Sequence, residues 1–416
     1  MAGAGEALAG AIETDKGRPA LWSYENRMVL VTSLIISFLA FDRLSTGYVG
    51  PYLIKAFGLS NTELGALYSI QALTVALSGY CFGRLSDATG RRKRLLVPML
   101  IVSAVCSLGS LLVQSYLMLM ILRLVMGGAL GGMSPVAQSI VSSQSSPHRI
   151  GLNIGIQTLL MFLVSQMLGP IIFTRLAGQW GWHAAYLASA LPFLILALAV
   201  GCTLAESNAP PAAALATGET DSNKQHRAAA PRNVWLSIGM SACFMLWLVI
   251  HTTFLPLYLV QMRGYTPTEA GYMLSVLGVA GCVGGLGLPM LSDRVGRRAA
   301  LVLGMSLALV VPLAALFWTG SPLVLTVLLF IGWTSVGCLP IYAVVVPGES
   351  ISPDKVAATI ALTIGAGEVV GGVIGPVLAG RLADSFGLSA PFWFTSAAVL
   401  VCLLLALCVQ RPQPNG

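Results

Sequence analysis

The chain has 416 residues, of which 56% are hydrophobic and only 9% are charged. Soluble domains carry about 25% charged residues, so this composition excludes an ordinary soluble protein and indicates one that lies in a lipid bilayer. The net charge of +7 does not indicate a nucleic-acid partner, because 17 of the 23 Lys and Arg residues fall in segments that we expect on the cytoplasmic side of the membrane. This bias toward one side is typical of membrane proteins.

Apolar segments of about 20 residues, the length that crosses a bilayer, occur twelve times. We therefore predict an all-α membrane protein with cytoplasmic tails at residues 1–27 and 410–416, six helices within residues 28–204, a cytoplasmic linker at residues 205–233 and six helices within residues 234–409. The predicted spans are Met28–Ile54, Thr62–Gly83, Leu95–Val113, Tyr116–Val141, Gly151–Leu176, Ala184–Leu204, Val234–Leu259, Thr268–Met290, Ala299–Trp318, Pro322–Val346, Val356–Leu382 and Pro391–Val409.

One sequence pattern occurs in both halves of the chain. Gly83–Arg92 reads GRLSDATGRR and Pro289–Arg298 reads PMLSDRVGRR, a separation of 206 residues. The same separation relates Gly169-Pro170 to Gly375-Pro376. A single separation at several places indicates two parallel six-helix halves, and transporters built from such repeats bind substrate near the bilayer midplane, between the repeats.

The loop at Gly83-x-x-x-Asp87-x-x-Gly90-Arg91-Arg92 resembles the signature loop between helices 2 and 3 of the major facilitator superfamily of transporters. The second copy departs from it, since Pro289 replaces the leading glycine. The resemblance implies that the charged loop residues hold the inner side closed in the outward-open state. The alternative is that they only set the topology. The expected gating residues are Gly83, Asp87, Gly90, Arg91, Arg92, Asp293 and Arg297.

Four charged residues stand out because they lie well inside predicted spans, away from the span ends: Asp42, Arg43, Arg123 and Glu368. A charge at the centre of a membrane helix costs about 2.5–3.5 kcal/mol on insertion scales, so each is expected to have a partner or a functional role. Asp42 and Arg43 are adjacent and do not face each other on a helix. We therefore expect Asp42 to pair with Arg123 of the fourth span, and the alternative is a static pair that only fixes helix packing.

The string Phe41-Asp42-Arg43 resembles the acidic-Arg pair of the anion:cation symporter branch of that superfamily, which includes sugar-acid and sialin-like carriers. The resemblance implies that Arg43 binds a substrate carboxylate and that Asp42 carries a proton. That branch has a glutamate in helix 4 where this chain has Leu130, so a second proton site is either absent or elsewhere, and Glu368, in the other half, is the candidate for it. Spinster-like lipid carriers share the Asp-Arg pair, so the pair does not fix the substrate.

The repeat indicates that the two halves have different roles in substrate binding. At the 206-residue separation, Asp42 and Arg43 match Leu248 and Val249, so we expect ionic chemistry in the first half and recognition of substrate shape in the second. A lone polar residue in a membrane helix also commonly bridges to a neighbouring helix. The expected substrate-binding residues are Arg43, Arg123, Tyr68, Gln71, Gln157, Trp247, His251 and Trp333, and the expected proton-coupling residues are Asp42 and Glu368.

The sequence thus predicts a proton-coupled secondary transporter that imports a small organic anion by alternating access, as a monomer in a bacterial inner membrane. The anion would be a monocarboxylate, a sugar acid or an aromatic acid. The alternatives are a proton antiporter that exports amphipathic drugs or lipid-like molecules, and a non-transporting receptor. The chain shows no nucleotide-binding loop and no metal-ligand spacing, so we expect no enzyme activity, cofactor or metal.

Overall fold

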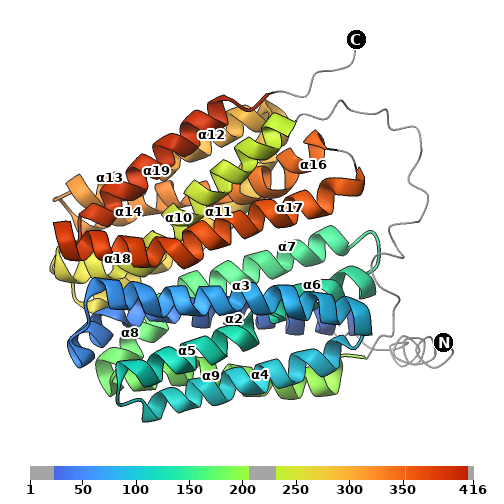
Figure 1. Ribbon diagram of the computed structural model, residues 1–416, viewed down its shortest axis with the longest axis horizontal. Coiled ribbons are helices and arrows are strands. Elements are labelled where there is room, and N and C mark those ends of the chain that lie inside the picture. Colours follow the sequence, from blue (N-terminus) through green and yellow to red (C-terminus); the bar gives the residue numbers. More distant parts are fainter. Residues whose placement is uncertain (1–22, 206–230, 352, 411–416) are drawn as a thin grey trace. The chain divides into compact units, whose positions relative to one another are not determined.

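The structure is a computed structural model that describes residues 23–205, 231–351 and 353–410. Within these ranges it contains twelve helical spans that are long and apolar enough to cross a membrane, and no strand (Figure 1). The predicted all-α membrane architecture is therefore confirmed.

The spans of the first half follow the predicted ones closely, and some are divided where the helical hydrogen-bond pattern changes. The first three are α2 (Tyr24–Phe57), α3 (Asn61–Thr89), and α4 (Arg92–Gly109) with η2 (Ser110–Leu112). The next three are α5 (Tyr116–Leu130) with α6 (Met133–Gln144), then α7 (Ile150–Met161) with η3 (Phe162–Leu168) and α8 (Gly169–Trp180), and finally α9 (Trp182–Thr203).

The second half has the same order of spans. It begins with α10 (Pro231–Gln261), α11 (Pro267–Val295), and α12 (Arg297–Ala308) with α13 (Val310–Phe317). The tenth span consists of α14 (Pro322–Trp333), η5 (Thr334–Gly337), α15 (Cys338–Pro340), η6 (Ile341–Val345) and α16 (Val346–Ser350). The last two are α17 (Pro353–Gly367) with η7 (Glu368–Ile374) and α18 (Gly375–Phe386), and α19 (Ala390–Leu407).

The predicted tails and linker lie mostly outside the described residues. Two boundaries are nevertheless visible. The helix α2 begins at Tyr24, ahead of the predicted start at Met28, and α10 begins at Pro231, inside the predicted linker at residues 205–233.

Backbone geometry repeats at the same 206-residue separation as the sequence. Glycine is the residue that most readily adopts a positive φ angle, and such an angle marks a turn or a helix end. The described glycines with positive φ form three pairs at this separation: Gly58 with Gly264, Gly90 with Gly296, and Gly181 with Gly387.

The π-helical segments η3 and η7 also match, because they begin at Phe162 and Glu368 and each ends directly before a Gly-Pro step. A proline has no N–H to donate to the preceding helical turn, and a local widening of the helix accommodates that loss. The two halves therefore share local backbone geometry as well as sequence.

The chain packs as two compact units. The first contains the described parts of residues 1–43, 74–165 and 183–223, and the second those of residues 44–73, 166–182 and 224–416. The helices α2 and α3 and the fifth span each contribute to both units. The second unit therefore contains the end of α2, the start of α3 and α8 in addition to the described helices of the second half.

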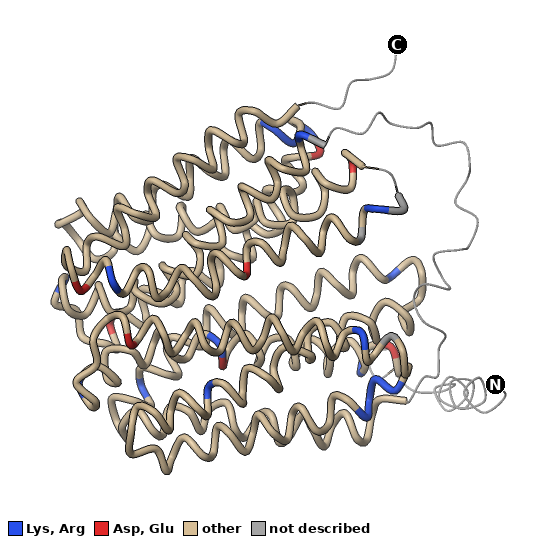
Figure 2. Tube along the Cα trace, in the orientation of Figure 1, with Lys and Arg blue, Asp and Glu red and all other residues tan. Residues whose placement is uncertain are grey.

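Charged residues are sparse along the middles of the helices and gather toward helix ends (Figure 2). The few charges within the spans stand out for this reason, since each must be compensated where water is scarce.

Candidate functional site

A buried ion pair joins α2 and α5 inside the first unit. Arg123 Nη1 lies 3.4 Å from Asp42 Oδ2, and the two side chains are 1% and 0% exposed. Attraction between opposite charges is strong where water does not screen it. The pairing of Asp42 with Arg123, which was expected from the sequence, is therefore observed.

Two further contacts hold the Arg123 guanidinium in place. Its central carbon lies 4.1 Å from the centre of the Tyr186 ring on α9, within the range of a cation–π interaction. Its Nη1 also lies 3.7 Å from Met126 Sδ. The other arm, Nη2, is buried and has no hydrogen-bond partner among the described residues. Arg123 therefore keeps capacity to donate to a further acceptor.

Arg43 follows Asp42 on α2 and is half-buried. Adjacent residues on a helix point about 100° apart, so the Arg43 side chain leaves α2 in a different direction from Asp42. The first unit thus contains one acid and two arginines within its spans: Asp42 is paired with Arg123, and Arg43 follows Asp42 on α2. These three side chains carry one net positive charge when the acid is ionised.

The second unit contains a buried aromatic cluster built on α10. The centre of the Trp247 ring lies 5.1 Å from those of Trp333 and Phe244 and 4.9 Å from that of His251. The His251 ring lies 5.3 Å from Phe392 on α19. All five side chains are at most 1% exposed. The three residues that the sequence indicated for the second half, Trp247, His251 and Trp333, are therefore neighbours.

Hydrogen bonds fix only some of the polar groups of this cluster. Trp333 Nε1 donates to Gln166 Oε1 at 2.8 Å, and His251 Nδ1 lies 2.7 Å from the Trp247 carbonyl oxygen. Trp247 Nε1 and His251 Nε2 are buried and have no hydrogen-bond partner among the described residues. Buried polar groups are nearly always satisfied in folded proteins, so these two nitrogens are suited to a polar atom of a bound molecule.

Glu368 is half-buried and begins the π-helical segment η7. The glycines beside it, Gly367 and Gly371, let this segment lie against α10, because a Cβ atom at either position would overlap Ser241 or Met245. The segment that carries Glu368 is therefore pressed against the helix that carries the aromatic cluster.

The remaining predicted substrate-binding residues are buried elsewhere. Tyr68 and Gln71 lie on the part of α3 that belongs to the second unit and are 3% and 1% exposed. In the first unit, Gln157 Nε2 donates to Thr32 Oγ1 at 3.1 Å and so connects α7 to α2. This contact is of the bridging kind that the sequence left open as the alternative for such residues.

In the first copy of the predicted gating motif, Arg92 donates to Ser143 Oγ at the end of α6. Arg92 is buried, Arg91 is exposed, and Gly90 adopts a φ of +66° at the turn between α3 and α4. The side chain of Asp87 lies outside the described residues.

The second copy is held by an ionic network. Arg297, at the start of α12, pairs with Asp293, four residues earlier in the last turn of α11. The Nε and Nη2 atoms of Arg297 donate to Glu349 Oε1 at 3.1 and 2.9 Å. Glu349 and Ser143 are 206 residues apart. Equivalent positions at the ends of α6 and α16 therefore anchor an arginine of each loop, by a hydroxyl in the first half and by a carboxylate in the second.

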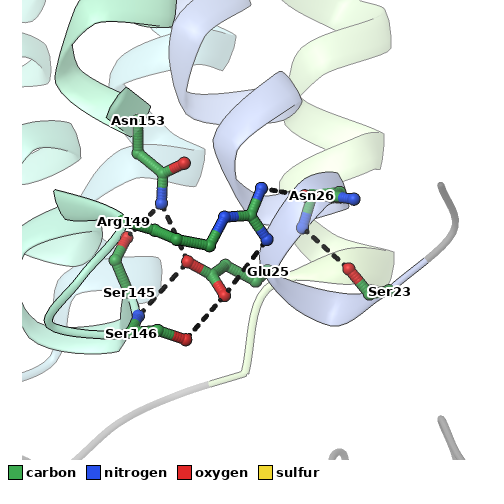
Figure 3. Close-up of polar contacts among 7 residues, drawn as sticks. All are labelled: Ser23, Glu25, Asn26, Ser145, Ser146, Arg149 and Asn153. Atoms are coloured by element: carbon green, nitrogen blue, oxygen red, sulfur yellow. Dashed lines mark hydrogen bonds and ion pairs between the residues drawn. The ribbon is translucent and has the colours of Figure 1, made fainter. Parts of the chain in front are cut away.

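A further polar cluster at the start of α2 was not identified from the sequence (Figure 3). Glu25 accepts hydrogen bonds from Ser146 Oγ and Asn153 Nδ2, each at 2.9 Å, and lies 3.5 Å from Arg149. Arg149 also donates to Asn26 Oδ1 at 2.8 Å. These contacts fix the start of α2 to the loop between α6 and α7 within the first unit.

Sequence reasoning also missed Tyr186, whose ring lies over the Arg123 guanidinium. A signal for it was present in the repeat. Tyr186 and Phe392 are 206 residues apart, and each packs against a buried polar side chain, Arg123 in one unit and His251 in the other.

Comparison with known proteins gives one family. The sequence model of the Major Facilitator Superfamily matches residues 32–364 and 289–416. Among curated proteins, a probable sulfoacetate transporter of Cupriavidus necator is 24% identical over 92% of this chain and 93% of its own length. The multidrug resistance protein MdtG of Proteus mirabilis is 28% identical over 92% of each chain. A 4-hydroxybenzoate transporter of Pseudomonas aeruginosa is 27% identical over 44% of this chain and 41% of its own.

Among solved structures, a bacterial homologue of the human lysosomal transporter spinster, in an inward-facing and occupied conformation, superposes with a TM-score of 0.72. The match covers 92% of this chain and 96% of that one at 18% sequence identity. At this level of identity the similarity establishes a shared fold.

Proposed function

This chain belongs to the Major Facilitator Superfamily of membrane transporters, and from that membership we propose that it is a proton-coupled secondary transporter that imports a small organic anion by alternating access. The observation that carries the proposal is the buried Asp42–Arg123 pair with Arg43 beside it on α2. An acid that can take up a proton, adjacent to arginines that can hold a carboxylate, is the minimum chemistry that anion–proton symport needs.

The proposed coupling step follows from charge. While Asp42 is ionised, it neutralises one of the two arginines. When Asp42 takes up a proton, its attraction for Arg123 weakens and the local charge rises by one unit. A substrate carboxylate is then attracted, and Arg43 can bind it through two parallel hydrogen bonds. Proton and anion would each favour binding of the other, which is the thermodynamic condition for symport.

The curated relatives support the anionic substrate. Two of them are named for sulfoacetate and 4-hydroxybenzoate, both organic anions. For this chain the proposal is a monocarboxylate, a sugar acid or an aromatic acid.

The test is Asp42→Asn in proteoliposomes. The amide mimics the protonated acid, so we expect substrate binding and counterflow exchange to persist while accumulation driven by a proton gradient fails. Glu269→Gln is the matched control, because Glu269 is a carboxylate in a local capping box at the start of α11. Normal proton-driven accumulation by Asp42→Asn would contradict the role of Asp42 and would make Glu368 the leading candidate.

Arg43→Lys tests the substrate role. Lysine keeps the positive charge but lacks the planar fork that binds a carboxylate through two hydrogen bonds. We expect the affinity for the anion to fall by about tenfold or more, which corresponds to the loss of one charge-assisted hydrogen bond. Unchanged affinity in a binding assay would remove Arg43 from the substrate site.

Export of amphipathic drugs is the second candidate function, because multidrug resistance proteins are among the relatives that match over nearly their whole length. A thermal-shift screen of the purified protein separates the two. Organic acids should raise its melting temperature if it carries anions, since a ligand stabilises the state that it binds. Stabilisation by cationic drugs and not by acids would favour export.

A further inference from the structure

Asp384 connects the last turn of α18 to the first turn of α3 within the second unit. Its Oδ1 accepts hydrogen bonds from Asn61 N and Asn61 Nδ2, each at 2.9 Å. Its Oδ2 accepts from Thr62 N at 2.9 Å and from Thr62 Oγ1 at 2.6 Å. The first N–H groups of a helix lack intrahelical acceptors, and the helix dipole favours a negative charge there. The carboxylate is therefore matched to this helix start.

The helix α3 has a cap of its own. Glu63 Oε2 accepts from Ser60 N at 2.8 Å, and Ser60 Oγ accepts from Glu63 N at 3.2 Å. This reciprocal pair is a capping box, which is sufficient to begin a helix. The bonds to Asp384 are therefore additional, and they connect α3 to another helix.

The repeat shows that this connection is made at only one of two equivalent helix starts. The equivalent helix start, that of α11, has the same kind of capping box, made by Thr266 and Glu269. The position equivalent to Asp384, 206 residues earlier, is Gly178, which has no side chain to accept hydrogen bonds. Asp384 is thus an addition at one of two equivalent places and not a requirement of the shared fold.

The backbones of α3 and α18 also meet closely at this end. A Cβ atom on Gly65 would overlap the Pro376 carbonyl group, and one on Gly380 would overlap Asn61 and Thr62. Separation of the two helices at this end must break this contact and all four hydrogen bonds of Asp384 together.

We propose that Asp384 is a latch that holds α3 and α18 together on the side of the membrane opposite the Gly83–Arg92 loop, and that it must be released each time the transporter opens on that side. This inference rests on the alternating-access part of the proposed function. Because the side chain is exposed, water competes for its hydrogen bonds, so the latch is strong enough to bias the opening and weak enough to be released.

Distances between spin labels test the latch without any substrate. Labels on Ala56→Cys, at the end of α2, and Ser385→Cys, on α18, occupy exposed positions of the second unit. The background replaces the eight native cysteines with alanine, and its fold is checked by thermal unfolding. We expect Asp384→Ala to raise the population with a long distance by about tenfold, the size of effect expected from losing a hydrogen-bonded charge.

Two more variants make the result specific. Asp384→Asn keeps the shape but places an amide N–H₂ where an acceptor stood, so it should shift the population in the same direction by a smaller factor. Glu269→Gln also removes a carboxylate from a helix start. The hydrogen bonds of Glu269 with Thr266 stay within that start, so the distance distribution of this variant should match that of the unsubstituted background.

Distances in Asp384→Ala and Asp384→Asn that are unchanged from this background, in folded protein, would overturn the latch. The result is separate from the identity of the substrate. If organic anions are not transported but the distances still shift, the latch stands and the proposed function fails.

Discussion

Arg123 is a buried cation whose positive charge is compensated mainly by one carboxylate and one aromatic ring. The Asp42 carboxylate neutralises its charge at 3.4 Å, and the Tyr186 ring covers its face at 4.1 Å. Taking two charges out of water is costly, and the ion pair offsets that cost only while both partners are present. The intact pair therefore adds little to the free energy of unfolding. Removal of one partner destabilises the fold strongly, because it leaves the other charge buried and uncompensated.

Removal of one partner should consequently lower the free energy of unfolding more than removal of both partners. We expect Asp42→Ala to lower the free energy of unfolding by about 3–5 kcal/mol, because Arg123 is left buried and uncompensated. The double variant Asp42→Ala/Arg123→Met should recover most of that loss, since methionine replaces the charge with an apolar chain of similar length. Denaturation in mixed micelles measures each member of the cycle. A double variant less stable than both single variants would show that the pair itself stabilises the fold.

Of the residues around this pair, sequence reasoning identified those whose burial carries an obvious penalty. Asp42, Arg43 and Arg123 are conspicuous because charge is expensive within a membrane helix. Tyr186 carries no such penalty, because an aromatic residue in an apolar helix is ordinary. Its position over Arg123 depends on how α9 packs against α5, and packing between distant helices is not encoded in a local pattern.

Between helices, close approach depends on glycine. A Cβ atom on Gly284 of α11 would overlap the Thr334 carbonyl group at η5, and one on Gly337 would overlap the Gly284 carbonyl group in turn. Small residues at such crossings let two membrane helices pack backbone to backbone. Gly287 is on the same helix, three residues later, and has no other atom within 4 Å of the place a Cβ would occupy.

These two glycines form a matched pair for substitution. Gly284→Ala should destabilise the protein by about 1–3 kcal/mol through overpacking. Gly287→Ala should be neutral or stabilise it by up to about 1 kcal/mol, since alanine favours a helix over glycine. Apparent melting temperatures in one detergent measure both. Equal effects from the two substitutions would mean that helix propensity, and not the crossing, governs this position.

At the scale of the whole molecule, the spans and the repeat were predictable, and the packing units were not. Hydrophobic length alone locates twelve spans, and one separation of 206 residues relates the loops, the turns and the π-helical segments. Composition cannot show that α2 and α3 each divide between two units near Arg43 and Leu73. That division depends on which parts of the helices pack together, and contacts between segments far apart in the sequence are not encoded in the hydrophobic pattern.

The orientation in the membrane is the last prediction, and it rests on charge. We propose that both termini and the segment at residues 205–233 are cytoplasmic, because 17 of the 23 Lys and Arg residues would then lie inside. Basic residues near the ends of spans set the orientation of a membrane protein. In a background without native cysteines, a membrane-impermeant maleimide added to intact cells should label Ser385→Cys at the end of α18. It should not label Ala88→Cys, in the loop after α3, or Ser222→Cys, in the linker.

The labelled positions act as controls for one another. Ser385 and Ala88 are both exposed, so a difference between them reports the side of the membrane and not burial. Permeabilised cells should label all three variants, which shows that each thiol is reactive. Labelling of Ser222→Cys from outside intact cells would show that the orientation is the reverse of the one proposed. It would also move the Asp384 latch to the cytoplasmic side, because α3 runs from Asn61 at one end to Thr89 at the other.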